Sequence, residues 1–211
     1  TRFKCDWSSD VCSSDLLDVG AGFGFFSVIA AQAGAARVDA VEPNPVVRIG
    51  PRVAAANGCG DRIVFHACDA RRLTLDRPAD VLIADLRGPT PFAGTALETI
   101  IDARTRLLRE GGRMITVRDR VMVAPSRMPR TFAKEIDAPL SRPDVVLAPV
   151  EAILRDTPLR CRVDAADVVA PAMSWTEIDY RTVDRTDHSG CAAWQLSHAA
   201  IIDGQIGRAH V

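Results

Sequence analysis

Residues 16–24 of the chain read LLDVGAGFG, and this stretch decides the fold. Its first four residues are mostly apolar, as in a short buried strand, and the glycines that follow allow a sharp backbone turn at the strand end. Residues 25–34 are rich in alanine and other apolar residues and are predicted to form a helix. A strand that passes through a glycine loop into a helix is the first unit of a parallel α/β sheet.

The alternation of strand and helix patterns continues to residue 117. We expect further strands over residues 37–41, 62–66, 80–84 and 114–117, and helices over residues 45–57 and 95–109. The fold class predicted from this alternation is α/β, with a doubly wound, Rossmann-like parallel sheet.

Prolines recur beyond residue 120 and separate short segments in which polar and apolar residues alternate. Such segments are typical of antiparallel β structure. The sequence therefore predicts an α/β domain over residues 16–120 and an antiparallel β-barrel-like domain over residues 121–205. The aromatic side chains expected in the barrel core are those of Trp175, Tyr180 and Trp194.

The two ends of the chain are related to each other through their coding DNA. Residues 5–16 read CDWSSDVCSSDL, and the complementary strand of the last part of one DNA sequence that encodes them translates as IGRAHV followed by a stop codon. The chain ends on IGRAHV, at residues 206–211. We therefore expect residues 1–15 and 206–211 to be non-native, adapter-like segments and the natural part to be an internal, truncated fragment.

Composition excludes several classes of protein. The formal net charge of the 211 residues is −1, and the natural part has no basic run, which argues against a nucleic-acid partner. No apolar run reaches the ~20 residues of a membrane span. The four cysteines of the natural part are widely spaced, so we expect no metal site and a reduced, cytoplasmic compartment.

Acidic residues stand at the ends of three predicted strands: Glu42, Asp69 and Asp85. In an open parallel sheet, ligands bind beyond the carboxyl ends of the strands. Glu42 lies about 20 residues beyond the glycine loop, where an acid at the end of the second strand can accept both hydroxyls of a ribose. Asp69 and the N–H of Ala70 can read the amine and ring of adenine, and the alternative for Asp69 is a surface acid in a turn.

The spacing of the glycines distinguishes between two nucleoside cofactors. A dinucleotide fingerprint is G-x-G-x-x-G, whereas here the third glycine comes one residue early and Asp18 precedes the loop. A carboxylate repels a pyrophosphate but tolerates the ammonium and sulfonium of S-adenosyl-L-methionine, so this cofactor is favoured over a nicotinamide dinucleotide. The predicted cofactor-binding residues are Asp18, Gly20, Ala21, Gly22, Gly24, Glu42, Asp69 and Ala70.

Two stretches resemble the protein arginine N-methyltransferase family. Residues 16–45, LLDVGAGFGFFSVIAAQAGAARVDAVEPNP, are similar to its cofactor motif, and residues 79–120, ADVLIADLRGPTPFAGTALETIIDARTRLLREGGRMITVRDR, to its acceptor loop and the helix and strand that follow. The resemblance implies a class I methyltransferase that transfers methyl to nitrogen of a protein or peptide, with a β-barrel that binds this substrate. It also allows a homodimer, because members of the family commonly pair through an arm inserted in the barrel.

The family holds its substrate guanidinium between two glutamates, and this pair is altered here. The first glutamate falls on Asp85, which is one methylene shorter, and the second falls on Gly94, which has no side chain. Glu98, about one helical turn further on, can partly substitute, so Asp85 and Glu98 are the predicted catalytic residues. Two alternatives therefore stay open: a small-molecule methyltransferase of the same fold, and a catalytically impaired module that only binds the cofactor.

Overall fold

The computed structural model describes residues 13–86, 88, 90–92, 94–128, 144–147, 150, 153 and 162–210. The chain divides into two compact units. The first comprises Thr1–Asp119 together with Ile178–His188, and the second comprises Arg120–Glu177 together with Ser189–Val211. The predicted boundary near residue 120 coincides with the first of these divisions, whereas residues 178–188 lie in the first unit.

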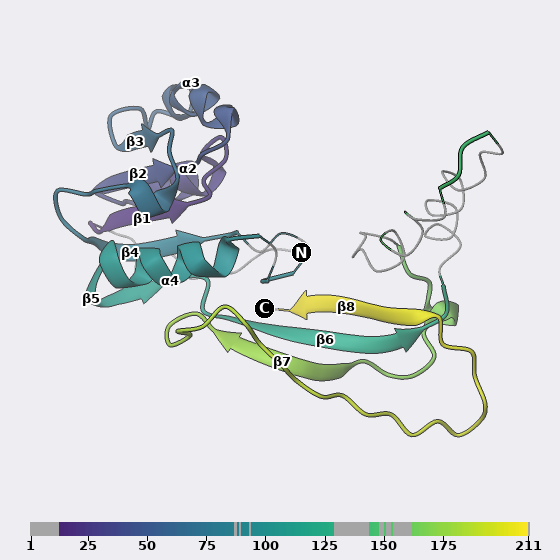
Figure 1. The fold of residues 1–211 in the computed structure, drawn as a ribbon. Coiled ribbons are helices and arrows are strands. Elements are labelled where there is room, and N and C mark those ends of the chain that lie inside the picture. Colours follow the sequence, from purple (N-terminus) through teal and green to yellow (C-terminus); the bar gives the residue numbers. More distant parts are fainter. Residues whose placement is uncertain are drawn as a thin grey trace. The chain divides into compact units, whose positions relative to one another are not determined.

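The first unit is built on a parallel five-stranded sheet (Figure 1). The strands are β1 (Asp15–Val19), β2 (Arg37–Val41), β3 (Ile63–His66), β4 (Ala79–Ala84) and β5 (Leu108–Met114). Their spatial order is β3-β2-β1-β4-β5, so β1 lies at the centre and the chain reverses its direction of winding there. The predicted doubly wound parallel sheet is confirmed.

Helices connect these strands and cover both faces of the sheet. They are α2 (Phe25–Gln32), α3 (Gly50–Ala56) and α4 (Ala96–Arg106), with 3₁₀ turns η1 (Pro45–Ile49) and η2 (Ala70–Arg72). Successive side chains of β1 point to opposite faces, so that Leu16 packs with α2 and α3, and Leu17 packs with α4. Each face of the sheet therefore has its own buried cluster.

The fifth strand differs from its prediction. The strand predicted over residues 114–117 instead begins at Leu108 and ends at Met114, so that Gly111 and Gly112 lie inside β5. Gly111 has a φ of +69°, and the register of β4 with β5 shifts between Ala79 and Val81. The glycines thus form an irregularity within an edge strand, a position where such bulges are common.

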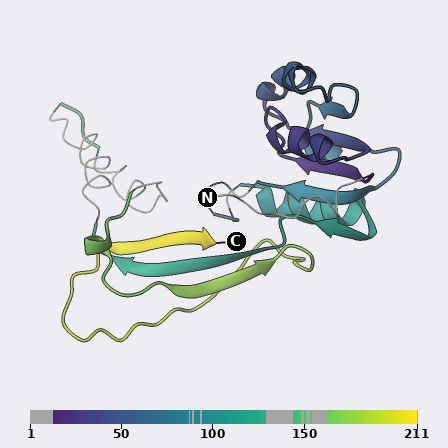
Figure 2. The same cartoon turned by 180° about the vertical axis from the view of Figure 1, so that it is seen from behind.

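The second sheet is antiparallel and has three strands in the order β7-β6-β8 (Figure 2). They are β6 (Arg118–Ser126), β7 (Met173–Asp179) and β8 (Gly204–His210). The antiparallel region expected after the α/β domain is therefore confirmed. Most of β8 consists of residues 206–210, which the sequence predicts to be adapter-like, and these residues pair with β6 from Arg120 to Ala124. A strand edge accepts any backbone, because ladder bonds join main-chain groups, so the adapter-like origin of this tail stays a prediction.

Tyr180 lies in the core of the first unit and not in a barrel core, which corrects the prediction. Its side chain is fully buried among residues of α4, β4 and β5. Its hydroxyl donates to Asp119 Oδ2 at 2.7 Å, and its carbonyl accepts from Arg104 at 2.8 Å. The alternation of polar and apolar residues around Tyr180 predicts a strand, but it does not show which of the two cores the end of that strand joins.

We expect the Tyr180→Phe substitution to destabilise the first unit by about 1–3 kcal/mol, because it removes a donor from the buried Asp119 carboxylate while preserving the ring. Urea unfolding followed by circular dichroism measures this change. Ser197→Ala, at an exposed position, serves as the control and should leave the midpoint unchanged. An unchanged midpoint for Tyr180→Phe would show that the hydroxyl bond contributes nothing to the core.

Candidate functional site

The carboxyl ends of the central strands meet at one edge of the sheet. Val19 at the end of β1 is level with Val41 of β2 and with Ala84 of β4, and Val41 is level with His66 of β3. The residues that directly follow these strands therefore emerge together. This register is the reason that the glycine loop and the strand-end acids, far apart in the sequence, can contribute to one site.

A hollow of about 260 Å³ lies at this edge. It brings together four predicted cofactor residues: Gly20, Glu42, Asp69 and Ala70. Its other wall consists of Leu86, after β4, and the start of α4, including Thr99. The remaining predicted residues, Asp18, Ala21, Gly22, Gly24, Asp85 and Glu98, do not line it. The hollow is close to the lower end of the ~300–1,000 Å³ typical of ligand pockets.

The glycine loop provides space more than donors. The N–H groups of Gly20 and Ala21 donate to the carbonyl of Val41 at 2.9 and 3.1 Å, so they are used within the protein. Gly20 has a φ of +77°, and a Cβ atom added to it would lie 2.2 Å from Cδ2 of Leu86. A side chain at this position would displace the end of the Leu86 side chain, which also lines the hollow. The loop therefore requires glycine chiefly for its backbone conformation.

Glu42 is held by two backbone amides. Its Oε2 accepts from the N–H of Gly22 at 3.2 Å, and its Oε1 accepts from the N–H of Asn44 at 2.7 Å. A carboxylate has about four lone-pair sites, so each oxygen retains capacity for another donor. The arrangement suits the predicted recognition of two ribose hydroxyls, because the carboxylate is already oriented before any ligand binds.

Asp18 lies beneath the loop, inside the protein. It is 1% exposed, and its Oδ2 accepts from the hydroxyl of Ser27 at 2.6 Å. Burial raises the pKa of Asp18 to about 6, and the hydrogen bonds from Ser27 oppose this rise only in part. The contact joins the end of β1 to the first turn of α2. Asp18 thus supports the loop from below and can act on a ligand only through its charge.

Asp69 has the opposite environment. It begins η2, where its Oδ1 accepts from the N–H of Arg71 at 2.9 Å. Hydrogen bonds from the side chain and backbone of Arg71 lower the pKa of Asp69 to about 2. The carboxyl group therefore stays ionised throughout the physiological range. The turn-capping role that the sequence left open and the predicted contact with adenine are compatible, because the side chain also lines the hollow.

The two predicted catalytic residues lie in different surroundings. Asp85 follows β4 and is exposed, whereas Glu98 on α4 accepts from Nη1 of Arg71 at 3.2 Å and lines another hollow beside Asp184. Gly94 has a φ of +58° and open space where a Cβ atom would lie. The neighbouring residues Arg87, Pro89 and Ala93 lie outside the described part of the chain. The catalytic roles of Asp85 and Glu98 stay predictions.

Sequence reasoning missed three residues that hold the site together: Ser27, Arg71 and Leu86. Ser27 occurs in the first turn after the loop, a spacing that could have suggested a partner for Asp18. Arg71 directly follows the Asp69-Ala70 pair, but its bond to Glu98 joins residues 27 positions apart. Nothing local to the sequence signals that contact or the approach of Leu86 to Gly20.

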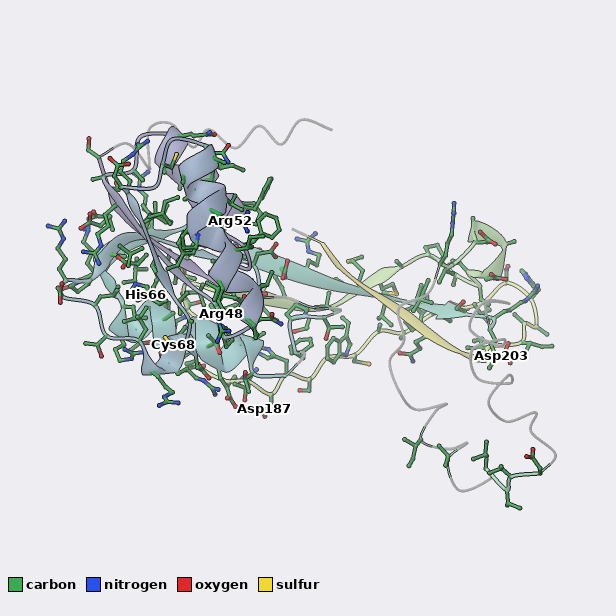
Figure 3. The ribbon with its side chains drawn as sticks, turned by 90° about the horizontal axis from the view of Figure 1, so that it is seen from above. Arg48, Arg52, His66, Cys68, Asp187 and Asp203 are labelled. Carbon is green, nitrogen blue, oxygen red and sulfur yellow. The ribbon has the colours of Figure 1, made fainter. Side chains whose placement is uncertain are left out.

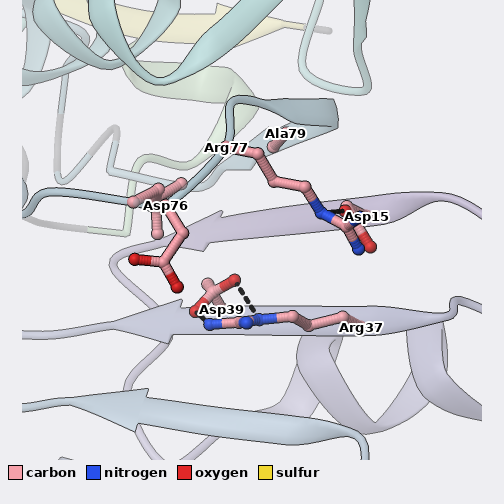
Figure 4. A pocket seen from close by; sticks show the side chains of 7 residues that line it. Asp15, Arg37, Asp39, Asp76, Arg77 and Ala79 are labelled. Atoms are coloured by element: carbon pink, nitrogen blue, oxygen red, sulfur yellow. Dashed lines mark hydrogen bonds and ion pairs between the residues drawn. The ribbon is translucent and has the colours of Figure 1, made fainter.

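A second hollow, of about 270 Å³, lies at the opposite edge of the sheet (Figure 4). Four of its five charged side chains form two ion pairs: Arg37 contacts Asp39 at 2.9 Å, and Arg77 contacts Asp15 at 2.5 Å. His66 also contacts Asp39, at 2.7 Å. Figure 3 labels His66 together with Cys68, in the segment that leads from β3 to Asp69. Charges compensated in this way, at the amino ends of the strands, do not form a ligand site.

None of the described residues forms a group of three or more His, Cys, Asp or Glu side chains that could bind a metal ion. No helix among the described residues is long and apolar enough to cross a membrane.

Comparison with known proteins links this geometry to one family. The chain is 31% identical over 122 residues to a probable protein arginine N-methyltransferase 6 of Arabidopsis thaliana, covering 58% of this chain and 28% of the relative. It is 36% identical over 118 residues to a probable histone-arginine methyltransferase CARM1 of Oryza sativa subsp. indica, covering 56% of this chain and 22% of the relative. The chain thus spans about a quarter of these relatives. No family model matches it.

The structural comparison extends further along the chain. The PRMT1 enzyme-prozyme complex of Trypanosoma brucei, determined with AdoHcy, matches with a TM-score of 0.72 at 21% identity, over 86% of this chain and 59% of that one. The fold is that of the protein arginine methyltransferases. Arabidopsis thaliana protein arginine methyltransferase 10 matches with a TM-score of 0.67 at 20% identity, over 83% and 56%. The predicted resemblance to the arginine methyltransferases is confirmed.

Because burial raises the pKa of Asp18 from 3.8 to about 6, this group stabilises the protonated native state. Its contribution is complete below pH 4 and is lost as the pH rises to about 6, since the native state then binds more protons than the unfolded state. A shift of this size corresponds to about 3 kcal/mol. The free energy of unfolding of wild type, relative to Asp18→Asn, should therefore fall across this window.

Urea unfolding between pH 4 and 8 measures the difference between the two proteins. Asp61→Asn, which neutralises an exposed aspartate, is the control and should follow wild type at every pH. If the difference between wild type and Asp18→Asn were the same at all pH values, Asp18 would titrate normally.

Proposed function

We propose that this chain is part of an S-adenosylmethionine-dependent methyltransferase that acts on nitrogen of a protein or peptide. The observation that carries the proposal is the meeting of Gly20, Glu42, Asp69 and Ala70 at one hollow beyond the carboxyl ends of the parallel strands. The similarity to arginine methyltransferases supports the reaction, and the AdoHcy present in the Trypanosoma complex supports the cofactor.

The residues at the hollow fit this cofactor. Glu42 would hold the ribose, Asp69 and the backbone of Ala70 would hold the adenine, and the part of the hollow lined by Gly20 would admit the chain that bears the sulfonium. Glu42 and Asp69 provide an oriented carboxylate near each end of a bound nucleoside. The amides of Gly20 and Ala21 already donate to Val41, so they cannot bind a phosphate. When bound, the cofactor supplies an electrophilic methyl group on a positively charged sulfur.

Asp85 is the candidate for orienting the acceptor. It follows β4 at the same edge of the sheet as Glu42, and its charge acts on Asp18, so it lies close to the proposed cofactor site. An exposed carboxylate can grip an amine, amide or guanidinium nitrogen by charge-assisted hydrogen bonds. Transfer then forms an N–C bond as the C–S bond breaks, and the nitrogen loses a proton.

One observation favours a second candidate function. Gly94 provides no side chain where the family has its second glutamate, and the carboxylate of Glu98 is engaged by Arg71. A single carboxylate localises the charge of a guanidinium poorly, which would leave a module that binds the cofactor but turns over slowly. The proposal that the protein forms a homodimer rests on the family resemblance alone.

Titration calorimetry with S-adenosylhomocysteine tests the cofactor site. We expect wild type to bind at one site and Gly20→Ala to bind about tenfold or more weakly, equivalent to ~1.4 kcal/mol, because the new methyl group displaces Leu86. Gly58→Ala is the matched control and should bind like wild type, since its φ of +67° carries the same backbone strain but its Cβ meets open space and the residue does not line the hollow. Absence of binding by wild type would overturn the proposed function.

Transfer of labelled methyl from the cofactor to a cell-protein fraction tests the acceptor class. We expect label in protein. Label found only in small metabolites would remove proteins from the list of acceptors and support the small-molecule alternative.

Gly94→Glu should increase methylation of an arginine-containing peptide by about tenfold or more, because a second carboxylate would complete the grip on the guanidinium. The substitution has room, although a φ of +58° costs a side chain about 1–2 kcal/mol. Gly94→Gln has the same shape without the charge and should give no increase. Equal rates for Gly94→Glu and Gly94→Gln would show that a second carboxylate at this position does not help this protein to methylate arginine.

A further inference from the structure

Arg71 connects the proposed adenine-binding edge to helix α4. Its Nη2 donates to Asp69 Oδ2 at 2.6 Å, and its Nε lies 3.1 and 3.2 Å from the two Asp69 oxygens. On the other side its Nη1 donates to Glu98 Oε2 at 3.2 Å. One guanidinium therefore holds two carboxylates that belong to different elements of the first unit.

A second arginine strengthens the same connection. Nη2 of Arg106, on α4, donates to the carbonyl of Ala70 at 2.9 Å, and its Nη1 donates to the carbonyl of Leu73. The Asp69-Ala70 pair is thus fixed twice, through the carboxylate by Arg71 and through the backbone by Arg106. Both bonds run to the helix whose first turn lines the hollow at Thr95, Ala96 and Thr99.

We propose that Arg71 is a positioning residue that fixes the Asp69 carboxylate for the nucleobase and so sets a preference for a 6-aminopurine over a 6-oxopurine. This inference rests on the proposed function. Asp69 contacts the base, whereas Arg71, which does not line the hollow, acts through it.

The chemistry of the pair supports this preference. An ionised carboxylate only accepts hydrogen bonds. It therefore accepts a hydrogen bond from the exocyclic amine of adenine. The carbonyl oxygen of a 6-oxopurine is also an acceptor, so it cannot form a hydrogen bond with this carboxylate. The side chain of Arg71 lowers the pKa of Asp69 to about 2, but an ordinary carboxyl group is also ionised at neutral pH, so Arg71 acts by orienting the acceptor and not by charging it. A site built around a hydrogen bond discriminates strongly against the analogue that cannot make it.

The contact with Arg71 also restricts rotation of the Asp69 side chain. An isolated aspartate at the start of a short turn can adopt several rotamers, and two of its oxygen lone pairs are now committed to one planar fork. Both Asp69 and Arg71 are about one third exposed, so water competes for each of them when the other is absent. Removing the guanidinium should therefore loosen the carboxylate and weaken its grip on the base, without altering the fold of η2, whose cap uses the backbone N–H of residue 71.

The test compares affinities for S-adenosylhomocysteine and S-inosylhomocysteine by titration calorimetry, with the full chain. We expect wild type to prefer the adenosyl compound by about tenfold or more. Arg71→Ala should lose most of this preference, and Arg71→Lys, which restores the charge but not the fork, should recover only part of it. Arg72→Ala removes a charge from the next residue of η2 and is the matched control, with the preference retained.

Asp69→Asn supplies an independent readout. Its amide can donate to a carbonyl oxygen, so the preference should move toward the inosyl compound, a change that a merely structural role would not produce. Thermal unfolding of each variant confirms that it is folded. Equal preference in wild type and Arg71→Ala overturns the inference and leaves the cofactor site intact. A wild type that binds neither compound overturns the proposed function and the inference together.

Discussion

The position of β1 between β2 and β4 is the constraint on which the site depends. Parallel pairing on both sides places Val19 level with Val41 and Ala84, so three connections leave the sheet at one edge. Glycine at position 20 then lets Leu86 approach from the β4 side, while Glu42 reaches across from the β2 side to the N–H of Gly22. Residues separated by 20 positions or more are thus brought together by strand register before any of them contacts another.

Two aspartates of this edge are in opposite protonation environments. Asp18 is buried and its pKa is raised to about 6, whereas Asp69 is about one third exposed, is bonded to Arg71, and has its pKa lowered to about 2. Such a division is how one set of carboxyl groups can perform different tasks at a single pH. The buried group joins β1 to α2 through Ser27, and the partly exposed group provides an acceptor.

Much of the first unit could be predicted from local sequence. The strands that contain Val19, Val41 and Ala84 have short apolar patterns ended by glycine or an acid, and these endings identify the ligand edge. Prediction failed where a distant contact decides the outcome. Tyr180 alternates with polar neighbours like a barrel residue, yet its hydroxyl is bound to Asp119 in the first unit. Likewise, the sequence shows that Glu98 is charged, but its pairing with Arg71 depends on the packing of α4 against η2.

The return of residues 178–183 to the first unit also affects how the protein is made. Ile178, Tyr180 and Val183 fill the face of the sheet that α4 covers, although β6 and the following segment are synthesised before them. Domains usually fold as units while the ribosome is still translating, with the N-terminal one first. Here the nascent α/β domain must wait with an incomplete apolar face until most of the second sheet has emerged, so the two halves of the chain are committed to one order of assembly.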